Sequence, residues 1–312
     1  MELKSARWGW AAGRSVESSR GINGLSDRPE QTTTSQSGRY TAHLISTSIF
    51  FDTAGSYGAG HSEKLMGMAF EGRRAELVIA TKFGVSFDEE ARTIGPPRFD
   101  HASIRSDCEA SLRRLKTNVI DLYQFHVKRC EPSEAVGIRE VLEELADAGK
   151  IRAYGWSTNF PECAAVFAEG ARCAAIQQSF SVFGGAEETL AFCEKHNLAS
   201  ILRGPLGKGL LSGKFTAETT FPPDDIRHQW DMKEESHAEQ LKKMEAIRDV
   251  LASRGRSPVQ GALCWLWAKS PVMIPIPGFR TETQVIENAG AMQFGPLNDR
   301  EMKEIDVLLG RT

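Results

Sequence analysis

The chain has 312 residues, a formal net charge of -3 and 41% hydrophobic residues. This length suits one large α/β barrel or two ordinary domains, and the apolar content can fill a sizeable core. The weakly acidic balance gives no reason to expect nucleic acid or an acidic membrane surface as a partner.

The cysteines and apolar runs narrow the cellular setting. The six cysteines are scattered and none forms a C-x-x-C pair, so neither a zinc site nor a disulfide framework is expected. Apolar runs stay below transmembrane length, and the N-terminus lacks the apolar segment of a secretory signal. We therefore expect a cytoplasmic protein with reduced thiols, no membrane span and no metal, acting as a monomer or weak homo-oligomer.

The first part of the chain differs from the rest. Residues 1–47 are rich in Ser, Thr, Gly and Arg, and their sparse apolar residues follow neither the helical nor the strand period. Residues 31–38 (QTTTSQSG) have the composition of unstructured chain. We therefore expect an anomalous, poorly ordered segment over residues 1–47 and a catalytic barrel domain over residues 48–312.

From Ser48 onward, strand patterns alternate with helical ones. Strands are expected at 48–52, 76–82, 119–126, 151–157, 174–177, 199–203 and 272–276. Helices are expected to begin near residues 62, 100, 133, 161, 187, 241, 258, 281 and 298. Residues 215–234 read as a long polar loop, which could cover a site.

Repeated strand, crossover helix and parallel strand units indicate a parallel sheet. Since the chain does not split into halves, a (β/α)8 TIM barrel is favoured over a doubly wound sheet. One of the eight units is not readable. If it exists it must lie within residues 1–47, so the first β/α unit is expected to be degenerate or missing.

Four ionisable side chains lie at the carboxyl ends of successive expected strands, where a barrel has its active site. They are Asp52, Tyr57, Lys82 and His126. Each alone has an ordinary structural explanation, but together they suit proton transfer to a carbonyl oxygen. Lys82 can favour the phenolate of Tyr57, Asp52 can pair with the buried lysine, and His126 can orient the carbonyl.

A reduction also needs a hydride source, which a protein cannot supply itself. The chain has no G-x-G-x-x-G after a strand, and residues 209–215 (GLLSGKF) do not have the spacing of a Walker A loop. The last strand instead runs through Gly278 into a helix start that carries Arg280. Backbone N–H groups, the helix dipole and the guanidinium can hold a phosphate there, although an Arg and a Thr that merely close a turn would look the same.

From about residue 50 to 310 the chain resembles the aldo-keto reductase family. The matching stretches are FDTA (51–54), YG (57–58), SE (62–63), ATK (80–82), SLRRL (111–115), IDLYQFH (120–126), GWS (155–157), IQ (176–177), PLGKGLL (205–211) and IPGFR (276–280). The resemblance implies an NADP(H)-dependent reduction of an aldehyde or ketone on a (β/α)8 barrel. It makes Tyr57 the general acid, Lys82 its pKa-lowering partner, Asp52 the counter-ion and His126 the carbonyl-orienting residue.

The resemblance also implies a set of cofactor-binding residues. Ser157 and Gln177 would hold the nicotinamide carboxamide, and Arg280 would favour NADP over NAD. The adenosine 2′-phosphate end would be held by Gly278, Arg280, Thr281, Gln284, Glu287 and Asn288. The remaining expected cofactor contacts are Thr158, Arg203, Gly204, Leu206 and Lys208.

Three departures from the family pattern affect these expectations. Thr158 stands where many members have Asn, and Arg203 where many place an aromatic ring under the nicotinamide, although a subgroup carries the same RGPL (203–206). Residues 1–47 do not match the family, as a frame change upstream or a divergent replacement would produce. A catalytically impaired or non-catalytic NADP-binding barrel is therefore the alternative function, and a lyase with Lys82 as Schiff-base nucleophile is a third.

Overall fold

The computed structural model of the chain describes residues 15–17, 50–223 and 225–311. Two predictions, that residues 1–47 are poorly ordered and that the first β/α unit is degenerate or missing, lie outside the described residues except for the strand at Ser15–Glu17. The boundary expected between residues 47 and 48 remains a proposal.

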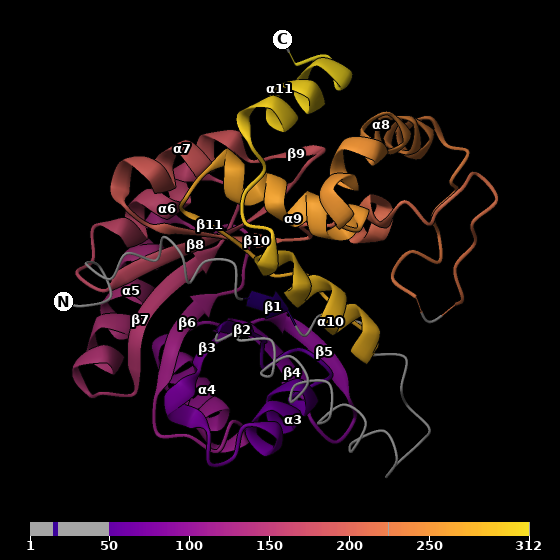
Figure 1. Cartoon of the computed structure of the whole chain (residues 1–312). Coiled ribbons are helices and arrows are strands. Elements are labelled where there is room, and N and C mark those ends of the chain that lie inside the picture. The colour runs from indigo at the N-terminus through magenta and orange to yellow at the C-terminus, as the bar shows by residue number, and fades with distance from the viewer. Residues whose placement is uncertain (1–14, 18–49, 224, 312) are drawn as a thin grey trace.

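The described part of the chain is built on a nine-stranded sheet (Figure 1). Eight strands follow one another in the order β1-β2-β3-β6-β7-β8-β10-β11, and every neighbouring pair is parallel. Their bounds are β1 (Ser15–Glu17), β2 (Phe50–Asp52), β3 (Val78–Phe83), β6 (Ile120–Phe125), β7 (Ile151–Ser157), β8 (Cys173–Ser181), β10 (Ala199–Arg203) and β11 (Met273–Pro275). β1 also contacts β11, which brings the two ends of the order together as in a (β/α)8 barrel.

The eighth strand therefore comes from the segment in which no strand pattern was readable. β1 pairs with β2 in the register Ser15 with Phe50 and Glu17 with Asp52. The strands expected from Ser48 onward are all confirmed, within a few residues at their ends. A short antiparallel β9 (Gly184–Gly185) pairs with β8, and the hairpin of β4 (Val85–Asp88) and β5 (Thr93–Pro97) forms a separate sheet.

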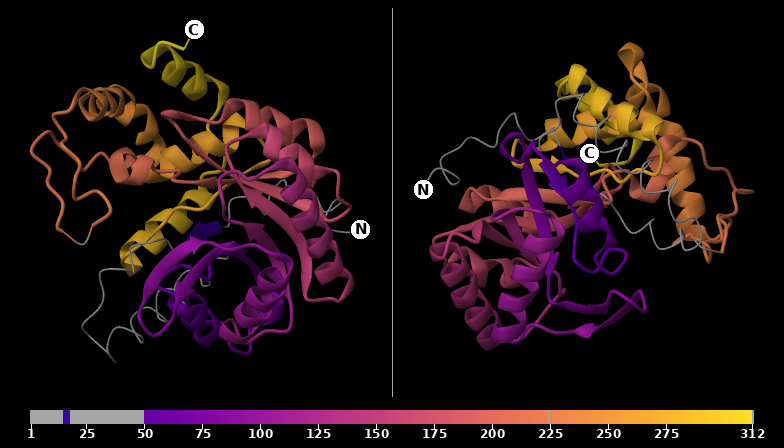
Figure 2. Two further views of the ribbon diagram at one scale, coloured as in Figure 1. Left: turned by 180° about the vertical axis from the view of Figure 1, so that it is seen from behind. Right: turned by 90° about the horizontal axis from the view of Figure 1, so that it is seen from below.

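Helices cover the outer side of the curved sheet (Figures 1 and 2). The α-helices are α3 (His61–Ala69), α4 (His101–Arg114), α5 (Pro132–Asp147), α6 (Pro161–Ala168), α7 (Glu187–His196), α8 (Glu235–Leu251), α9 (Pro258–Lys269), α10 (Glu282–Gly290) and α11 (Asp299–Leu308). Short 3-10 turns are η2 (Arg74–Glu76), η3 (Gly207–Ser212), η4 (Ser253–Gly255) and η5 (Ala291–Gln293). The expected caps are present, since Asp100 accepts from Ser103 N at 3.0 Å and Ser257 forms a capping box with Gln260.

Apolar side chains fill two kinds of space. Within the barrel, small and branched residues pack around the axis, among them Ala80, Leu122 and Ala153. Between sheet and helices, larger residues such as Trp156 and Trp265 form the outer core. Along β6, Leu122 packs around the axis and the buried Gln124 follows two residues later, so a polar layer begins at the carboxyl ends of the strands.

The loop between η3 and α8 projects away from the sheet in both views of Figure 2. Over 213–223 and 225–234 it contains turns but no helix or strand, as the polar composition predicted. Among the described residues, no helix combines the length and the apolar character needed to cross a membrane.

Candidate active site

Tyr57 lies in a tight loop between β2 and α3. Asp52 ends β2, and the loop is then folded by backbone hydrogen bonds from Tyr57 N to Ala54 O (3.0 Å) and from Gly60 N to Gly55 O (2.7 Å). Gly60 has a φ of 85°, which favours glycine. The loop therefore turns back on itself and buries Tyr57, whose exposed fraction is 6%.

Lys82 connects the acid and the phenol. Its Nζ donates to Asp52 Oδ2, to the carbonyl of Thr53 at 2.9 Å and to Tyr57 Oη at 3.2 Å. The side chains of Lys82 and Asp52 have no solvent exposure. A buried ion pair of this kind holds both groups charged only because each compensates the other. The lysine ammonium is thus fixed beside the tyrosine hydroxyl.

His126 completes the group at the end of β6. Its backbone N–H donates to Phe83 O at 2.9 Å, which holds the residue next to β3. Its ring meets the ring of Tyr57 edge to face, with centroids 5.8 Å apart and planes at 82°. The structure therefore brings together all four residues predicted to be catalytic, at the carboxyl ends of β2, β3 and β6.

A layer of side-chain amides lies beneath these residues. Asp52 Oδ1 accepts from Gln124 Nε2 at 3.0 Å and from Gln177 Nε2 at 2.9 Å. Gln177 Nε2 also lies 3.3 Å from Gln124 Oε1, and Ser157 Oγ donates to Gln177 Oε1 at 3.3 Å. Ser157 and Gln177, predicted to bind cofactor, are therefore joined to the acid. Gln124 was not predicted, although a glutamine at an inward position of an apolar strand was the available signal.

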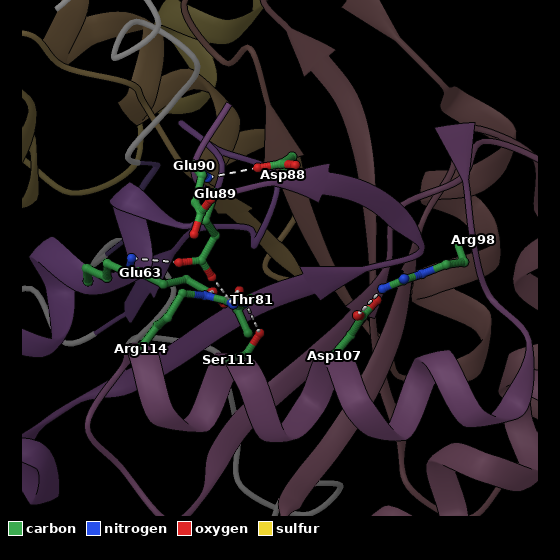
Figure 3. A network of polar contacts seen from close by, with 10 residues as sticks. Glu63, Thr81, Asp88, Glu89, Glu90, Arg98, Asp107, Ser111 and Arg114 are labelled. Carbon is green, nitrogen blue, oxygen red and sulfur yellow. Dashed lines mark hydrogen bonds and ion pairs between the residues drawn. The ribbon is translucent and has the colours of Figure 1, made fainter. Parts of the chain in front are cut away.

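A second ionic network supports the Tyr57 loop from outside (Figure 3). Glu63, which is fully buried on α3, accepts from Thr81 Oγ1 at 2.6 Å and from Arg114 Nε at 2.6 Å. Arg114 also donates to Glu89 on the β4–β5 connection at 2.9 Å. Burial opposes the charge of Arg114, but Glu63 and Glu89 raise its pKa above the usual value. The network joins α3, α4, β3 and the hairpin.

Cofactor-binding residues were also predicted after β7 and at the end of β10. Thr158 turns its hydroxyl to the carbonyl of Lys128 at 2.9 Å, so it caps the local backbone. Asn159, which was not predicted, accepts through Oδ1 from Ser179 N at 2.9 Å and from Arg203 at 3.1 Å. Arg203 is thereby fixed at the end of β10, and Gly204, Leu206 and Lys208 follow in the turn that leads into η3.

The residues predicted to bind the 2′-phosphate end of the cofactor lie at the N-terminus of α10 and along this helix. Gln284 Oε1 accepts from Arg280 N at 2.6 Å, and Thr281 and Gln284 form a capping box. The Arg280 side chain is about half exposed, and Gly278 precedes it in the same loop. Asn288 is buried, and its Nδ2 has no hydrogen-bond partner among the described residues. The carbonyl of Glu287 accepts from Gln260 at 3.1 Å.

Asp225 links the turn at η3, which contains Lys208, to Arg280 at the start of α10. Its carboxylate pairs with Arg227 at 2.7 Å and with Arg280 at 3.0 Å, while Arg227 donates to the carbonyl of Lys208 at 2.9 Å. Hydrogen bonding from Arg227 holds the pKa of the Asp225 carboxyl well below its ordinary value. No sequence pattern predicted this bridge, because an acid and an arginine in a polar loop are common.

The residues present suit a phosphate-bearing nicotinamide cofactor. A half-exposed guanidinium at a helix N-terminus and an unsatisfied buried amide suit a phosphate and its ribose. A serine and a glutamine at the strand ends suit a carboxamide. Among residues 15–17, 50–223 and 225–311, no group of three or more His, Cys, Asp or Glu side chains is arranged to hold a metal ion.

Comparison with known proteins identifies the class. The model of the Aldo/keto reductase family matches residues 21–309. Aldo-keto reductase YhdN of Bacillus subtilis is 33% identical over 273 residues, which cover 84% of this chain and 79% of the relative. Aldo-keto reductase yakc of Schizosaccharomyces pombe is 31% identical over 269 residues, with 82% and 77% covered.

A solved structure agrees with this family. The glycerol dehydrogenase AKR11B4 from Gluconobacter oxydans superposes with a TM-score of 0.81 at 30% identity, covering 97% of this chain and 90% of that one. The protein is thus an oxidoreductase built on a (β/α)8 barrel. It belongs to the aldo/keto reductase family, as the sequence motifs had indicated.

Proposed function

We propose that the protein reduces a small aldehyde or ketone to an alcohol with NADPH, with Tyr57 as the general acid. The observation that carries the proposal is the position of Lys82 Nζ, which is bonded at once to Asp52, to Thr53 O and to Tyr57 Oη at 3.2 Å. The name of the Schizosaccharomyces pombe relative gives NADP(+), which supports the choice of cofactor. We place this activity in the cytoplasm.

NADPH, when bound, supplies the hydride that the protein lacks. The carboxamide would be held by Ser157 and Gln177, and the 2′-phosphate end by the α10 start, with Arg280 as its cation. Thr281, Gln284, Glu287, Asn288 and Gly278 would shape that end, and Arg203, Gly204, Leu206 and Lys208 the stretch between. Thr158 would contribute through its backbone, because its hydroxyl is already bonded to Lys128 O.

The protein's own residues would move the proton. The Tyr57 hydroxyl gives its proton to the carbonyl oxygen, while His126 donates to that oxygen and orients it. The phenolate that remains lies at hydrogen-bond distance from the Lys82 ammonium, which stabilises it. Asp52 keeps the ammonium charged, and solvent returns the proton to Tyr57 after the product leaves.

The test is NADPH oxidation against a panel of small aldehydes and ketones, with Tyr57→Phe alongside. We expect turnover of at least one carbonyl and a drop in kcat of roughly 10²–10⁴-fold in Tyr57→Phe, the range for general acid catalysis. Undiminished turnover in that variant contradicts the mechanism. NADPH binding without turnover of any carbonyl would instead favour the alternative of a non-catalytic NADP-binding barrel.

A further inference from the structure

Gln124 is a fully buried amide that the proposed proton transfer does not use. It lies on β6 next to the ion pair, and its Nε2 donates to Asp52 Oδ1 at 3.0 Å. Its Oε1 faces Gln177 Nε2 at 3.3 Å. Both amide ends therefore have partners inside the barrel. A buried amide with both ends bonded has a fixed direction, and that direction affects its neighbours.

The charge on Asp52 sets the direction of two amides. A carboxylate paired with Lys82 can only accept hydrogen bonds, so the amide end that faces Oδ1 must be the NH2 group. This holds for Gln124 and for Gln177, which both reach Oδ1. The second N–H of Gln177 is then directed to Gln124 Oε1, and its carbonyl oxygen is left facing Ser157.

We infer that Gln124 is a positioning residue which, with Asp52, keeps the carbonyl oxygen of Gln177 turned outward as a hydrogen-bond acceptor. The inference rests on the proposed function, in which Gln177 meets the nicotinamide carboxamide. An outward acceptor selects the NH2 group of that carboxamide. The same charge that holds Lys82 beside Tyr57 would thus also select which end of the carboxamide the barrel accepts.

Gln124 is needed because Asp52 alone fixes only one N–H of Gln177. Without Gln124, Asp52 still requires the NH2 end of Gln177, but the amide keeps only one of its two Nε2 bonds and can tilt, so its carbonyl oxygen is no longer held in one direction. The site would then accept a cofactor that lacks the NH2 donor almost as well as one that has it. Discrimination between two such cofactors reports on amide direction, and general loss of stability does not change it.

The probe is a pair of dinucleotides, NADP+ and its 3-acetylpyridine analogue, in which a methyl ketone replaces the carboxamide. Dissociation constants are measured by quenching of tryptophan fluorescence on the full chain. We expect the wild-type protein to bind NADP+ about tenfold more tightly than the analogue, which corresponds to one buried hydrogen bond. In Gln124→Met, which has nearly the same volume, the ratio should fall to within about twofold.

Gln178→Met is the matched control. Gln178 is the next residue on β8 and is equally buried, but its Nε2 donates to Ser200 Oγ at 2.7 Å, away from the ion pair. The Gln178→Met variant should be less stable while keeping the wild-type ratio of the two dissociation constants. Gln124→Leu is measured as well, so that failure of one variant to fold leaves the other.

Equal binding of the two dinucleotides by the wild-type protein overturns the inference without any variant. An unchanged ratio of dissociation constants in a folded Gln124 variant also overturns it. An equal fall of that ratio in Gln178→Met does the same. If the wild-type protein binds neither dinucleotide, the proposed function itself fails. If it binds and turns over NADPH but the Gln124 variants keep the ratio, only the role of Gln124 fails.

Discussion

At the scale of single residues, Lys82 forms a buried ion pair with Asp52. Both side chains of the Lys82–Asp52 pair have no solvent exposure. Lys82→Met removes the cation and leaves an uncompensated carboxylate, so we expect the free energy of unfolding to fall by about 3–5 kcal/mol. Urea denaturation measures this change.

Asp52→Asn combined with Lys82→Met serves as the control for that variant. The double variant replaces the pair by neutral groups of similar size, which is often close to neutral in stability. We expect it to recover most of the lost free energy while remaining inactive. A double variant no more stable than Lys82→Met would show that the pair is not what holds this part of the barrel.

Arg280 is expected to decide between the two nicotinamide cofactors. Its guanidinium is half exposed at the start of α10, where a 2′-phosphate would be neutralised. In Arg280→Gln, KM for NADPH should rise roughly ten- to a hundredfold, since a charge-assisted hydrogen bond is lost, while KM for NADH stays unchanged. Arg300→Gln on the exposed side of α11 is the matched control. A parallel rise for both cofactors would mean that Arg280 only supports the fold.

At the residue scale, sequence patterns locate side chains that directly follow a strand. Asp52, Lys82 and His126 lie at strand ends that local apolar patterns make visible, and the structure brings them together with Tyr57. The sequence could not show Asn159 or Asp225, since their partners lie on distant elements. The direction of the Gln124 amide is set by a charge on another strand, which no local pattern contains.

At the scale of elements, Arg114 fixes the Tyr57 loop against α4 and the hairpin. It bonds Glu63 on α3 and Glu89 beyond β4, and its side chain lies against Gly55 and Gly60. A β-carbon on Gly60 would approach Arg114 Cδ to 2.9 Å, so loop and guanidinium are in close contact. The loop that carries the proposed acid is therefore held by an ion pair from another helix.

Arg114→Met should release that loop. Because Glu63 would be left buried and unpaired, we expect a loss of about 3–5 kcal/mol in stability, together with a lower kcat. Arg113→Met, at the neighbouring exposed position of the same helix, should change stability by no more than about 0.5 kcal/mol. Urea denaturation and steady-state kinetics separate the two effects. Equal behaviour of the two variants would contradict the role given to Arg114.

Element types were predictable because crossover helices and parallel strands have clear periods. The hairpin of β4 and β5 was not, since both strands are short and β5 is exposed and contains Pro96 and Pro97. Its position depends on Glu89, whose partners Lys64 and Arg114 lie elsewhere in the chain. β1 was not readable either, because Ser15–Glu17 is only three residues long and has no apolar pattern.

At the scale of the whole molecule, six free thiols are distributed through the barrel and its helices. Burial raises the pKa of Cys108, Cys193 and Cys264 from 9.0 to about 12. All three pack in the layers between sheet and helices. Because unfolding exposes these thiols, their titration couples the stability of the whole protein to pH.

Proton binding by the folded and unfolded chains determines how stability changes with pH. Above pH 9.0 the unfolded chain releases these thiol protons while the folded chain retains them, so the folded state binds more protons and stability falls as pH rises. Below the unfolded pKa the contribution is fully present. Each such thiol lowers the unfolding free energy by up to about 1.4 kcal/mol per pH unit within this window.

Urea denaturation at about pH 8 and about pH 10.5 tests this coupling. We expect a lower midpoint at the higher pH, and a smaller decrease in Cys264→Ala, in which one of the three thiols is absent. At the lower pH, Ellman's reagent should react with these thiols only after urea is added, because the thiolate is the reactive form. Rapid reaction of Cys108, Cys193 and Cys264 in the folded protein, or a midpoint independent of pH, would show that the core does not exclude water from them.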